Sequence, residues 1–257
     1  MAIVGEALSL LALKALIHVT TKAGATVTFK KGSTTMATKT ANSSGVAELE
    51  VLSSDWGSWT VDVSWAVSGA GNATGSTTFI VSEATTYNKT ISLRLWFVKD
   101  GDFVSGVSHS FSSEHASSGS FNDAGDYVNL HQNADRVDHW DAIAGYLGSA
   151  ITFDGYWKSL VFETRERGYG VTGSTLAAGL TTGSGASPTF SYYVQLRGNG
   201  EHSSYNSKHT STLNVSSVSG SYKVVVRGAM YDHWNQYSSA IISGPCDINI
   251  YNAYLSA

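Results

Sequence analysis

The sequence predicts an all-β protein built from two β-sandwiches, with one short helix at its N-terminus. Of its 257 residues only 14% are charged, 11% are aromatic, and 26 are glycine. This composition is typical of many short strands joined by tight turns, because aromatic side chains favour strands and glycine favours turns. The chain nowhere alternates strands with helices, which disfavours a parallel α/β enzyme.

Charge and cysteine content exclude several classes of function. The formal net charge is −4 and no cluster of lysine or arginine is present, so we predict no nucleic-acid binding, which needs a basic surface. Cys246 is the single cysteine, which rules out an intrachain disulfide and a cysteine-based zinc site.

Residues 1–16 are predicted to form the helix. One apolar stripe at helical spacing contains Val4, Leu8, Leu11 and Ala15. We expect this stripe to anchor the protein in another subunit; the alternative is that it packs on its own domain. Glu6 and Lys14 interrupt the apolar stretch and no basic region precedes it, so neither a signal peptide nor membrane insertion is expected.

Residues 17–93 change to strand periodicity. Segments that alternate or run apolar are separated by turns rich in glycine, serine and asparagine. The segments are IHVTT, ATVTFKK, TMATKT, AELEV, WTVDVSWAV, TTFIVS and NKTISLRLWF. Their number and length predict a small antiparallel sandwich.

Within this region, SSGVAELEVLSSDWGSWTVDVSW places a glycine turn before a strand, then a loop with Gly57, then a strand opened by Trp59. This order resembles the transthyretin-like and Cna-B-type modules, which are Ig-like sandwiches. The resemblance covers residues 17–93 and implies a spacer, a stalk or an adhesive unit.

Residues 94–257 predict a second, larger sandwich of the jelly-roll type. Strand-like segments are DYVNLHQ, SAITFDGYWKSLVFETRE, TFSYYVQLRG, HTSTLNVSSVSGSYKVVVRGAMY and CDINIYNAYLS. The stretches HSFSSEHASSGSFNDAG and GLTTGSGASP are expected to be loops, because glycine and serine dominate them.

The same region contains motifs in a recognisable order: LWFVKDGDFVSG, then AITFDGYWKSLVFE, then TLNVSSVSGSYKVVV. It resembles the C-terminal β-sandwich of structural proteins of bacteriophages and prophages of Gram-positive gut bacteria. The most specific match is a hydroxyl-rich turn that leads into a buried strand, formed by Ser216, Ser217, Ser219, Gly220, Ser221 and Tyr222. The resemblance implies location in the virion, other capsid or tail proteins as partners, and assembly as a homo-oligomer.

Two triplets of Asp, His and Trp raise the question of a catalytic or zinc site: Asp138, His139 and Trp140, and Asp232, His233 and Trp234. Neighbouring residues on a strand point to opposite faces, so Asp and His rarely converge there. No G-x-S-x-G nucleophile motif is present, and the two histidines lack the H-x₃-H spacing of a zinc site. We therefore predict no enzymatic activity.

Two alternatives based on carboxylates remain open. One is a structural calcium ion at SFNDAGD, which offers Asn122, Asp123 and Asp126 as oxygen ligands. A glycosidase would need two carboxylates facing each other across a cleft. Candidates for that pair are Asp154, Glu163, Glu166 and Glu201.

The aromatic residues favour carbohydrate recognition, because an indole beside an imidazole can stack on a sugar ring and bind its hydroxyls. We predict a glycan site formed by His139, Trp140, Tyr231, His233, Trp234 and Tyr237. Tyr146, Tyr156, Trp157 and Tyr205 are further aromatic candidates. The competing interpretation is that these rings fill the sandwich core or a subunit interface.

Together these observations predict a non-enzymatic virion protein, attached by its N-terminal region, whose outer sandwich binds host or mucus glycans. A head decoration or head fibre and a tail appendage both fit. The alternatives are a tail-tip receptor-binding protein and a secreted carbohydrate-binding module or carbohydrate-active enzyme, which would carry an export signal.

Overall fold

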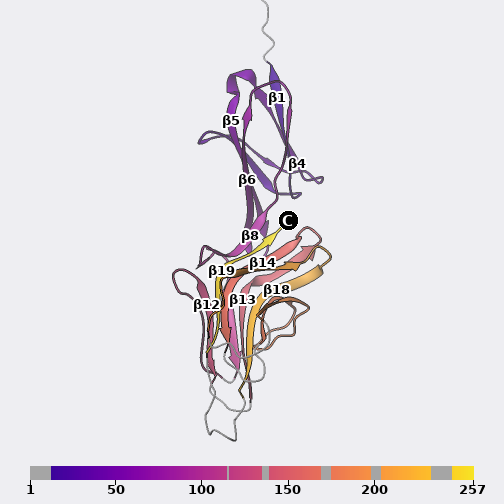
Figure 1. The fold of residues 1–257 in the computed structure, drawn as a ribbon. Helices are drawn as coiled ribbons and strands as arrows, with labels where there is room; N and C mark the ends of the chain where they lie inside the picture. The colour runs from indigo at the N-terminus through magenta and orange to yellow at the C-terminus, as the bar shows by residue number, and fades with distance from the viewer. Residues whose placement is uncertain (1–12, 115, 135–138, 169–174, 198–203, 233–244) are drawn as a thin grey trace, which may run out of the picture. The chain divides into compact units, whose positions relative to one another are not determined.

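The computed structural model describes residues 13–114, 116–134, 139–168, 175–197, 204–232 and 245–257 (Figure 1). Within these residues the chain forms strands β1 to β19 and one 3₁₀ turn, η1 (Ser53–Asp55). The all-β prediction is confirmed. The chain divides into two compact units: the first runs up to Trp65 and includes Thr74–Leu93, and the second comprises Ala66–Ala73 and Arg94–Ala257.

The first unit is a sandwich of seven strands. One sheet has the order β4-β1-β7, and the other has the order β3-β2-β5-β6. The bounds are β1 (Lys14–Thr20), β2 (Thr26–Lys31), β3 (Thr34–Thr40), β4 (Val46–Leu52), β5 (Gly57–Val67), β6 (Gly71–Val81) and β7 (Thr86–Thr90).

The core of the first unit follows from alternation along its strands. Alternate residues are buried along β1 and in the central parts of β2 and β5, because one face of each sheet packs on the other sheet. Trp59 is 1% exposed, and its indole N–H donates to the carbonyl oxygen of Asp55 at 3.0 Å. The aromatic residue that opens β5 is therefore a core residue with a satisfied donor.

The predicted N-terminal helix is wrong for its last residues. Lys14–Thr20 is a strand that pairs antiparallel with β4 and parallel with β7. Pairing on both sides satisfies its backbone groups, and Ala15, only 2% exposed, belongs to the sandwich core rather than to an anchoring stripe. Val4, Leu8 and Leu11 lie outside the described residues. No helix in the described ranges is long and apolar enough to cross a membrane.

The bounds of two strand segments also differ from prediction. Strand β6 begins at Gly71, so most of SGAGNATGS is strand rather than loop. Ala73, in the part of β6 that belongs to the second unit, is 0% exposed. The segment NKTISLRLWF divides into β7 of the first unit and β8 (Arg94–Lys99) of the second unit.

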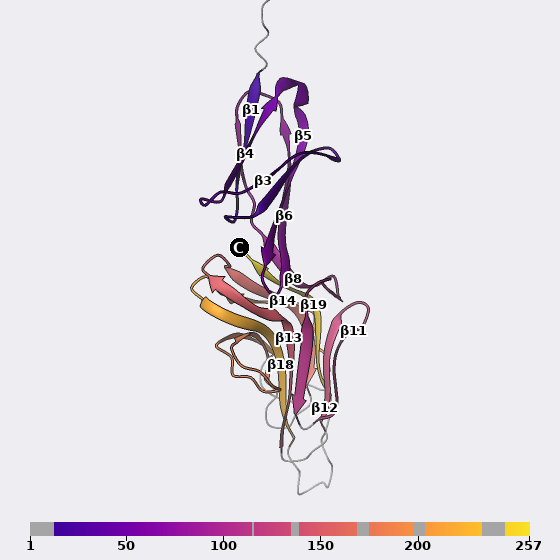
Figure 2. The same ribbon diagram turned by 180° about the vertical axis from the view of Figure 1, so that it is seen from behind.

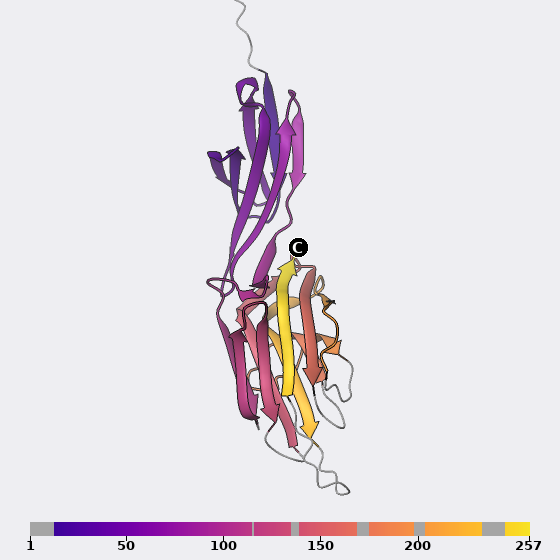
Figure 3. The ribbon, with the colours of Figure 1, turned by 60° about the vertical axis from the view of Figure 1, so that its left-hand side comes forward.

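The second unit is a jelly-roll sandwich of two sheets (Figures 1 and 2). In the first sheet, called the β19 sheet, β19 (Pro245–Ser256) lies between β12 (Val128–Ala134) and β14 (Ser159–Gly168). Figure 3 faces this sheet, with β19 in yellow. Its other strands are β11 (Ala116–Asp123) beside β12, β17 (His209–Asn214) beside β14, β8 beside the end of β19, and β9 (Asp102–Phe103).

The second sheet, called the β18 sheet, has the order β10-β13-β18-β15-β16. Its strands are β10 (His109–Glu114), β13 (His139–Asp154), β15 (Thr175–Thr181), β16 (Tyr192–Arg197) and β18 (Ser219–Asp232). Apolar side chains of both sheets fill the space between them, among them Leu130, Ile143, Leu147 and Phe162, each 0% exposed.

The serine-rich stretch 109–125 is not the loop that its composition predicted, since it contains β10 and β11. Strand β10 pairs with β13, and β11 pairs with β12 and buries Phe121 to 3% exposure. Pairing with neighbouring strands outweighs the weak strand propensity of serine and glycine here.

The hydroxyl-rich turn before β18 has a structural role. The side-chain oxygen of Asn214 accepts hydrogen bonds from the backbone N–H of Ser216 at 3.0 Å and from its hydroxyl at 2.7 Å. Val215 and Val218 are buried beneath the turn, and Gly220 adopts φ +112°, which favours glycine. The motif therefore shapes the entry to β18.

Candidate functional site

The outer face of the β19 sheet carries an organised group of polar and aromatic side chains. Alternation puts Ile248 and Ile250 of β19 in the core, so Asp247, Asn249 and Tyr251 point outward. We call this surface the Asp247 face. It consists of Asn129, His131, Glu163, Arg165, Arg167, Tyr205, Lys208, Asp247, Asn249, Tyr251 and Asn252.

Asp247 is the centre of this face, although the residue is only 3% exposed. Arg167 Nε donates to one carboxylate oxygen, and His131 Nδ1 lies 2.6 Å from the other. Asn129 Nδ2 lies 3.4 Å from Asp247 and donates to Asn249 Oδ1 at 2.7 Å. Burial alone would lower the pKa of Arg167, but the hydrogen bond to Asp247 and its charge outweigh burial and raise that pKa.

Two tyrosine rings on this face interact with cations. The guanidinium groups of Arg165 and Arg167 each lie 4.7 Å from the centroid of the Tyr205 ring. The ammonium of Lys208 lies 4.8 Å from the Tyr251 ring, and Tyr127 meets that ring edge-on at 5.8 Å. Such cation–π contacts hold long side chains in defined positions.

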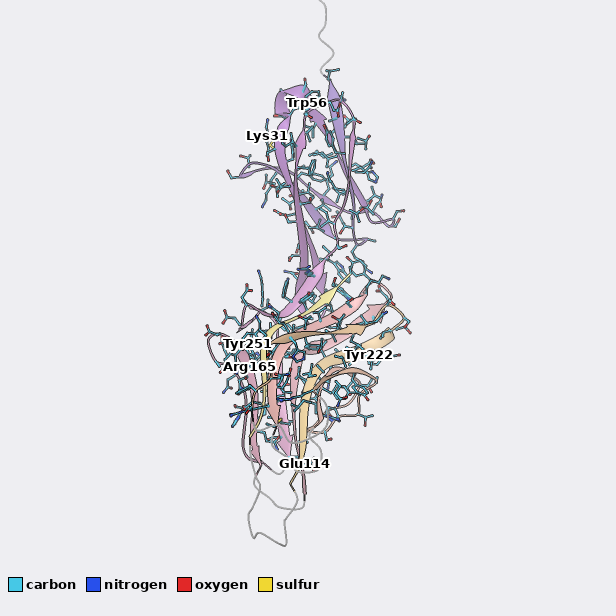
Figure 4. The ribbon with its side chains drawn as sticks, in the orientation of Figure 1. Lys31, Trp56, Glu114, Arg165, Tyr222 and Tyr251 are labelled. Carbon is cyan, nitrogen blue, oxygen red and sulfur yellow. The ribbon has the colours of Figure 1, made fainter. Side chains whose placement is uncertain are left out.

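A β-bulge in β19 brings two consecutive residues to the outer surface. The register to β14 shifts at Glu163 and Thr164, so that Tyr251 is the extra residue of β19. Asn252 Nδ2 then donates to Glu163 Oε2 at 2.5 Å, and Lys208 Nζ lies 2.8 Å from Glu163 Oε1. The hydrogen bond from Lys208 is the main cause that lowers the pKa of Glu163. Figure 4 shows Arg165 and Tyr251 on the same side of the sandwich.

Tyr205 is positioned by its neighbour Asn206, which forms three hydrogen bonds with Glu166 of β14. The Asn206 backbone N–H donates to Glu166 O at 3.0 Å, its Oδ1 accepts from Glu166 N at 2.7 Å, and its Nδ2 donates to Glu166 Oε2 at 2.6 Å. Arg165 Nε donates to Asn206 O at 3.1 Å. These bonds fix the chain that carries Tyr205 against the edge of β14.

Glu166 points into the sandwich and is 0% exposed, whereas Glu163 lies on the outer face. Burial is the main cause that raises the pKa of Glu166, against opposing hydrogen bonds and the charges of His209 and Arg197. Because these two carboxylates lie on opposite faces of β14, they do not form the facing pair that a glycosidase needs. Of the other candidates, Asp154 accepts from the backbone N–H of Tyr156, and Glu201 lies outside the described residues.

The described residues of the two Asp-His-Trp triplets, His139, Trp140 and Asp232, lie at one end of the β18 sheet. The backbone register places His139 opposite Asp232 and Trp140 opposite Tyr231 in the antiparallel pair of β13 and β18. The structure does not describe Asp138, His233, Trp234 and Tyr237. For the four residues in register it describes the backbone but not the side chains. The glycan site predicted from these triplets therefore stays a prediction.

Asn122 and Asp123 end β11, and Asp126 follows in the turn to β12. Asp123 Oδ1 accepts the backbone N–H of Gly125 at 2.8 Å, and its carboxyl is the main cause that raises the pKa of Asp102. In the part of the chain that the structure describes, no group of three or more His, Cys, Asp or Glu residues is arranged to hold a metal ion. The predicted calcium site gains no support there.

Among the other aromatic candidates, Trp157 is 1% exposed, which fits the core interpretation. Tyr146 is 7% exposed, but it lies with Ala144 and Val225 on the side of the β18 sheet that faces away from the sandwich core. Tyr205 belongs to the Asp247 face. The sequence analysis missed most of that face, although alternation gives a signal for it. FETRERG places Arg165 and Arg167 on one side of its strand, and CDINIYN places Asp247 and Asn249 on one side of its strand.

Comparison with known proteins identifies no family, because no family model matches the chain and no curated protein matches it. Solved structures of low similarity do match. A variant of a family 29 carbohydrate-binding module, described as probing ligand recognition, is 11% identical with a TM-score of 0.35, covering 64% of this chain and 91% of that one.

Two further matches are also carbohydrate-binding modules. A structure described as the basis for promiscuous specificity of modules from the β-sandwich superfamily is 11% identical with a TM-score of 0.36, covering 90% of this chain and 84% of that one. A module described as recognising mannan is 14% identical with a TM-score of 0.34, covering 63% and 94%. At such low scores the likeness carries no argument about a ligand, so the function has to be inferred from the side chains of this chain.

Proposed function

We propose that the second unit binds a glycan chain on the Asp247 face, without chemical turnover. The observation that carries the proposal is the buried carboxylate of Asp247 on the outward side of a sheet, held by Arg167 and His131, on a face that also carries the rings of Tyr205 and Tyr251.

Folding alone does not call for such a surface. The outer face of an antiparallel sheet is normally solvated, and its polar side chains move freely in water. Here hydrogen bonds and cation–π contacts order Asn129, Arg165, Arg167 and Lys208, which costs side-chain entropy. Groups that are ordered before binding lose less entropy when a ligand arrives, so this arrangement favours recognition.

The chemistry of the face suits sugars. Sugar hydroxyls both donate and accept hydrogen bonds, and the face offers guanidinium and ammonium donors beside amide and carboxylate acceptors. Tyrosine rings supply flat apolar surface for the C–H faces of a sugar. From Asp247 to Tyr251 the strand rises about 13 Å, so the face accommodates a chain of sugars rather than a single ring.

The proposal is tested on an array of bacterial surface polysaccharides and mucin glycans, with the full chain and with Tyr205→Ala and Tyr251→Ala. We expect each variant to bind its glycan about 30-fold more weakly, the effect of removing a central aromatic contact worth about 2 kcal/mol. Tyr193→Ala is the matched control, because Tyr193 is 58% exposed on the β18 sheet.

Retained binding in both tyrosine variants, with loss in Trp140→Ala instead, would move the glycan site to the end of β13 and β18. Release of soluble sugars from a bound polysaccharide would contradict binding without turnover.

We further propose that the protein is carried on a phage particle, as a head decoration, head fibre or tail appendage. The support is the resemblance of residues 94–257 to phage structural proteins. Identical copies on a particle would let weak glycan sites act together. Mass spectrometry of purified particles should detect the chain in stoichiometric amount, and its absence from particles would refute this role.

Attachment through the N-terminal region can be tested without disturbing the fold. Deletion of residues 1–12 leaves β1 intact, whereas deletion of residues 1–16 would remove Ala15 from the core. We expect the shorter deletion to give a folded protein that no longer co-purifies with particles. Normal incorporation of that variant would contradict the anchoring hypothesis.

A further inference from the structure

The outer side of the β18 sheet contains a polar cavity, with a volume of about 410 Å³. Serine hydroxyls dominate its lining, and Lys223 contributes the one charged side chain among the lining residues. This volume is in the range of small-molecule sites. The cavity lies in the sheet opposite to the Asp247 face, so an inference about it does not depend on the function proposed for that face.

A bulge in β13 creates the cavity. The register between β13 and β18 shifts from Leu147 opposite Val224 to Ile151 opposite Tyr222, so residues 148–150 loop out of the strand opposite Lys223. The loop is fixed: Gly148 has φ +75°, and its N–H donates to Ser108 O at 2.7 Å. Bulges of this kind are often found beside functional sites.

The opposite wall is also held in place. Tyr146 OH donates to Gly185 O at 2.7 Å, and this hydrogen bond holds the loop after β15 against the sheet. Lys223 Nζ lies 3.3 Å from Gly183 O and 5.5 Å from the centroid of the Tyr146 ring. These two contacts hold the ammonium at the cavity, and an ammonium has three N–H donors, so donors remain for a ligand.

The lining therefore combines one cation with several hydroxyls and contains no carboxylate. Ser110, Ser112, Ser149 and Ser184 offer groups that donate or accept. A ligand that suits this lining has one negative charge and several hydroxyls. The partly exposed ring of Phe111, at 45%, adds apolar surface at the cavity.

We propose that this cavity binds a sugar acid, with the carboxylate of the ligand on Lys223 and its hydroxyls on the serine side chains. Binding is measured by calorimetry on the full chain with glucuronate as the probe, and with glucose and acetate as partial mimics. Glucuronate is expected to bind at one saturable site. Glucose and acetate should each bind at least about tenfold more weakly, because each lacks half of the recognised groups.

The variants separate the cavity from other basic surfaces. Lys223→Gln should weaken glucuronate binding about tenfold or more, and Lys223→Arg should largely keep it. Ser184→Trp, at an exposed loop position, should block the cavity while the ammonium stays. Lys158→Gln is the matched control, because Lys158 also donates to a glycine carbonyl, that of Gly155, in an exposed turn.

Three results would overturn the proposal: glucuronate binding that Lys223→Gln and Ser184→Trp leave unchanged, acetate binding as tight as glucuronate binding, or loss of binding in Lys158→Gln. Melting temperatures of all variants are measured in parallel. Weakened binding supports the proposal only in variants that melt like the parent chain.

Discussion

Replacing Asp247 with asparagine tests whether the Asp247 face is an ordered network. Asparagine has nearly the same shape, but it removes the negative charge and one acceptor oxygen. The change therefore acts on the contacts with Arg167 and His131 and leaves the packing of β19 intact.

The expected loss of stability follows from the burial of the three side chains. The Asp247 side chain is 4% exposed, while those of Arg167 and His131 are 33% and 26% exposed. A hydrogen bond to a charged group contributes about 1.5–3 kcal/mol, and partial exposure of both partners reduces this contribution. We expect Asp247→Asn to cost about 2–3 kcal/mol, which lowers the melting temperature of a unit of this size by about 5–10 °C.

Calorimetric melting checks this value, with Glu50→Gln as the control. The pair of Glu50 and Lys14 has a similar length, 2.8 Å, but its side chains are 65% and 57% exposed. The control should change stability by less than about 0.5 kcal/mol. If Asp247→Asn melts within about 1 °C of the parent chain, the network of Asp247, Arg167 and His131 is not formed in solution.

Two further predictions concern stability. Glu166 is buried and its pKa is raised, so Glu166 binds a proton more readily in the folded state than in the unfolded chain. The stability that this proton contributes is present below the ordinary pKa of 4.5. It is lost as pH rises through the raised pKa. Glu166→Gln should remove this loss and be more stable than the parent near neutral pH in urea titrations, and parallel pH profiles of the two proteins would contradict this. Gly179→Ala would put a methyl group 2.1 Å from Tyr192 O, so we expect a destabilisation of about 1–3 kcal/mol, seen as a lower urea midpoint; an unchanged midpoint would show that β16 shifts freely.

The sequence predicted the sandwiches because alternation is a local property of each strand. Val27 and Phe29, or Ile248 and Ile250, recur with period two and are buried as expected. The prediction of helix for residues 14–16 was wrong because Ala15 fits a helical stripe and a strand pattern equally well. Only pairing of β1 with β4 and β7, which are distant in sequence, decides between the two.

The Asp247 face was harder to predict, because strands far apart in the sequence assemble it. Arg167 and Asp247 are separated by 80 positions, and His131 and Asp247 by 116. Alternation in FETRERG and CDINIYN indicates which side chains share one face of a strand, but it does not indicate that the two strands are neighbours. The two Asp-His-Trp triplets, in contrast, stand out by composition alone. The β-bulge that brings Asn252 to the outer face beside Tyr251 also has no signature in the residues around it.

An NMR footprint shows directly whether the Asp247 face binds the glycan. Amide and side-chain signals are followed while the glycan that scores highest on the array is added. We predict shifts at Asn129, Arg165, Arg167 and Tyr251 across the β19 sheet. Shifts confined to His139 and Trp140 at the end of β13, with those four residues unchanged, would contradict binding at the Asp247 face.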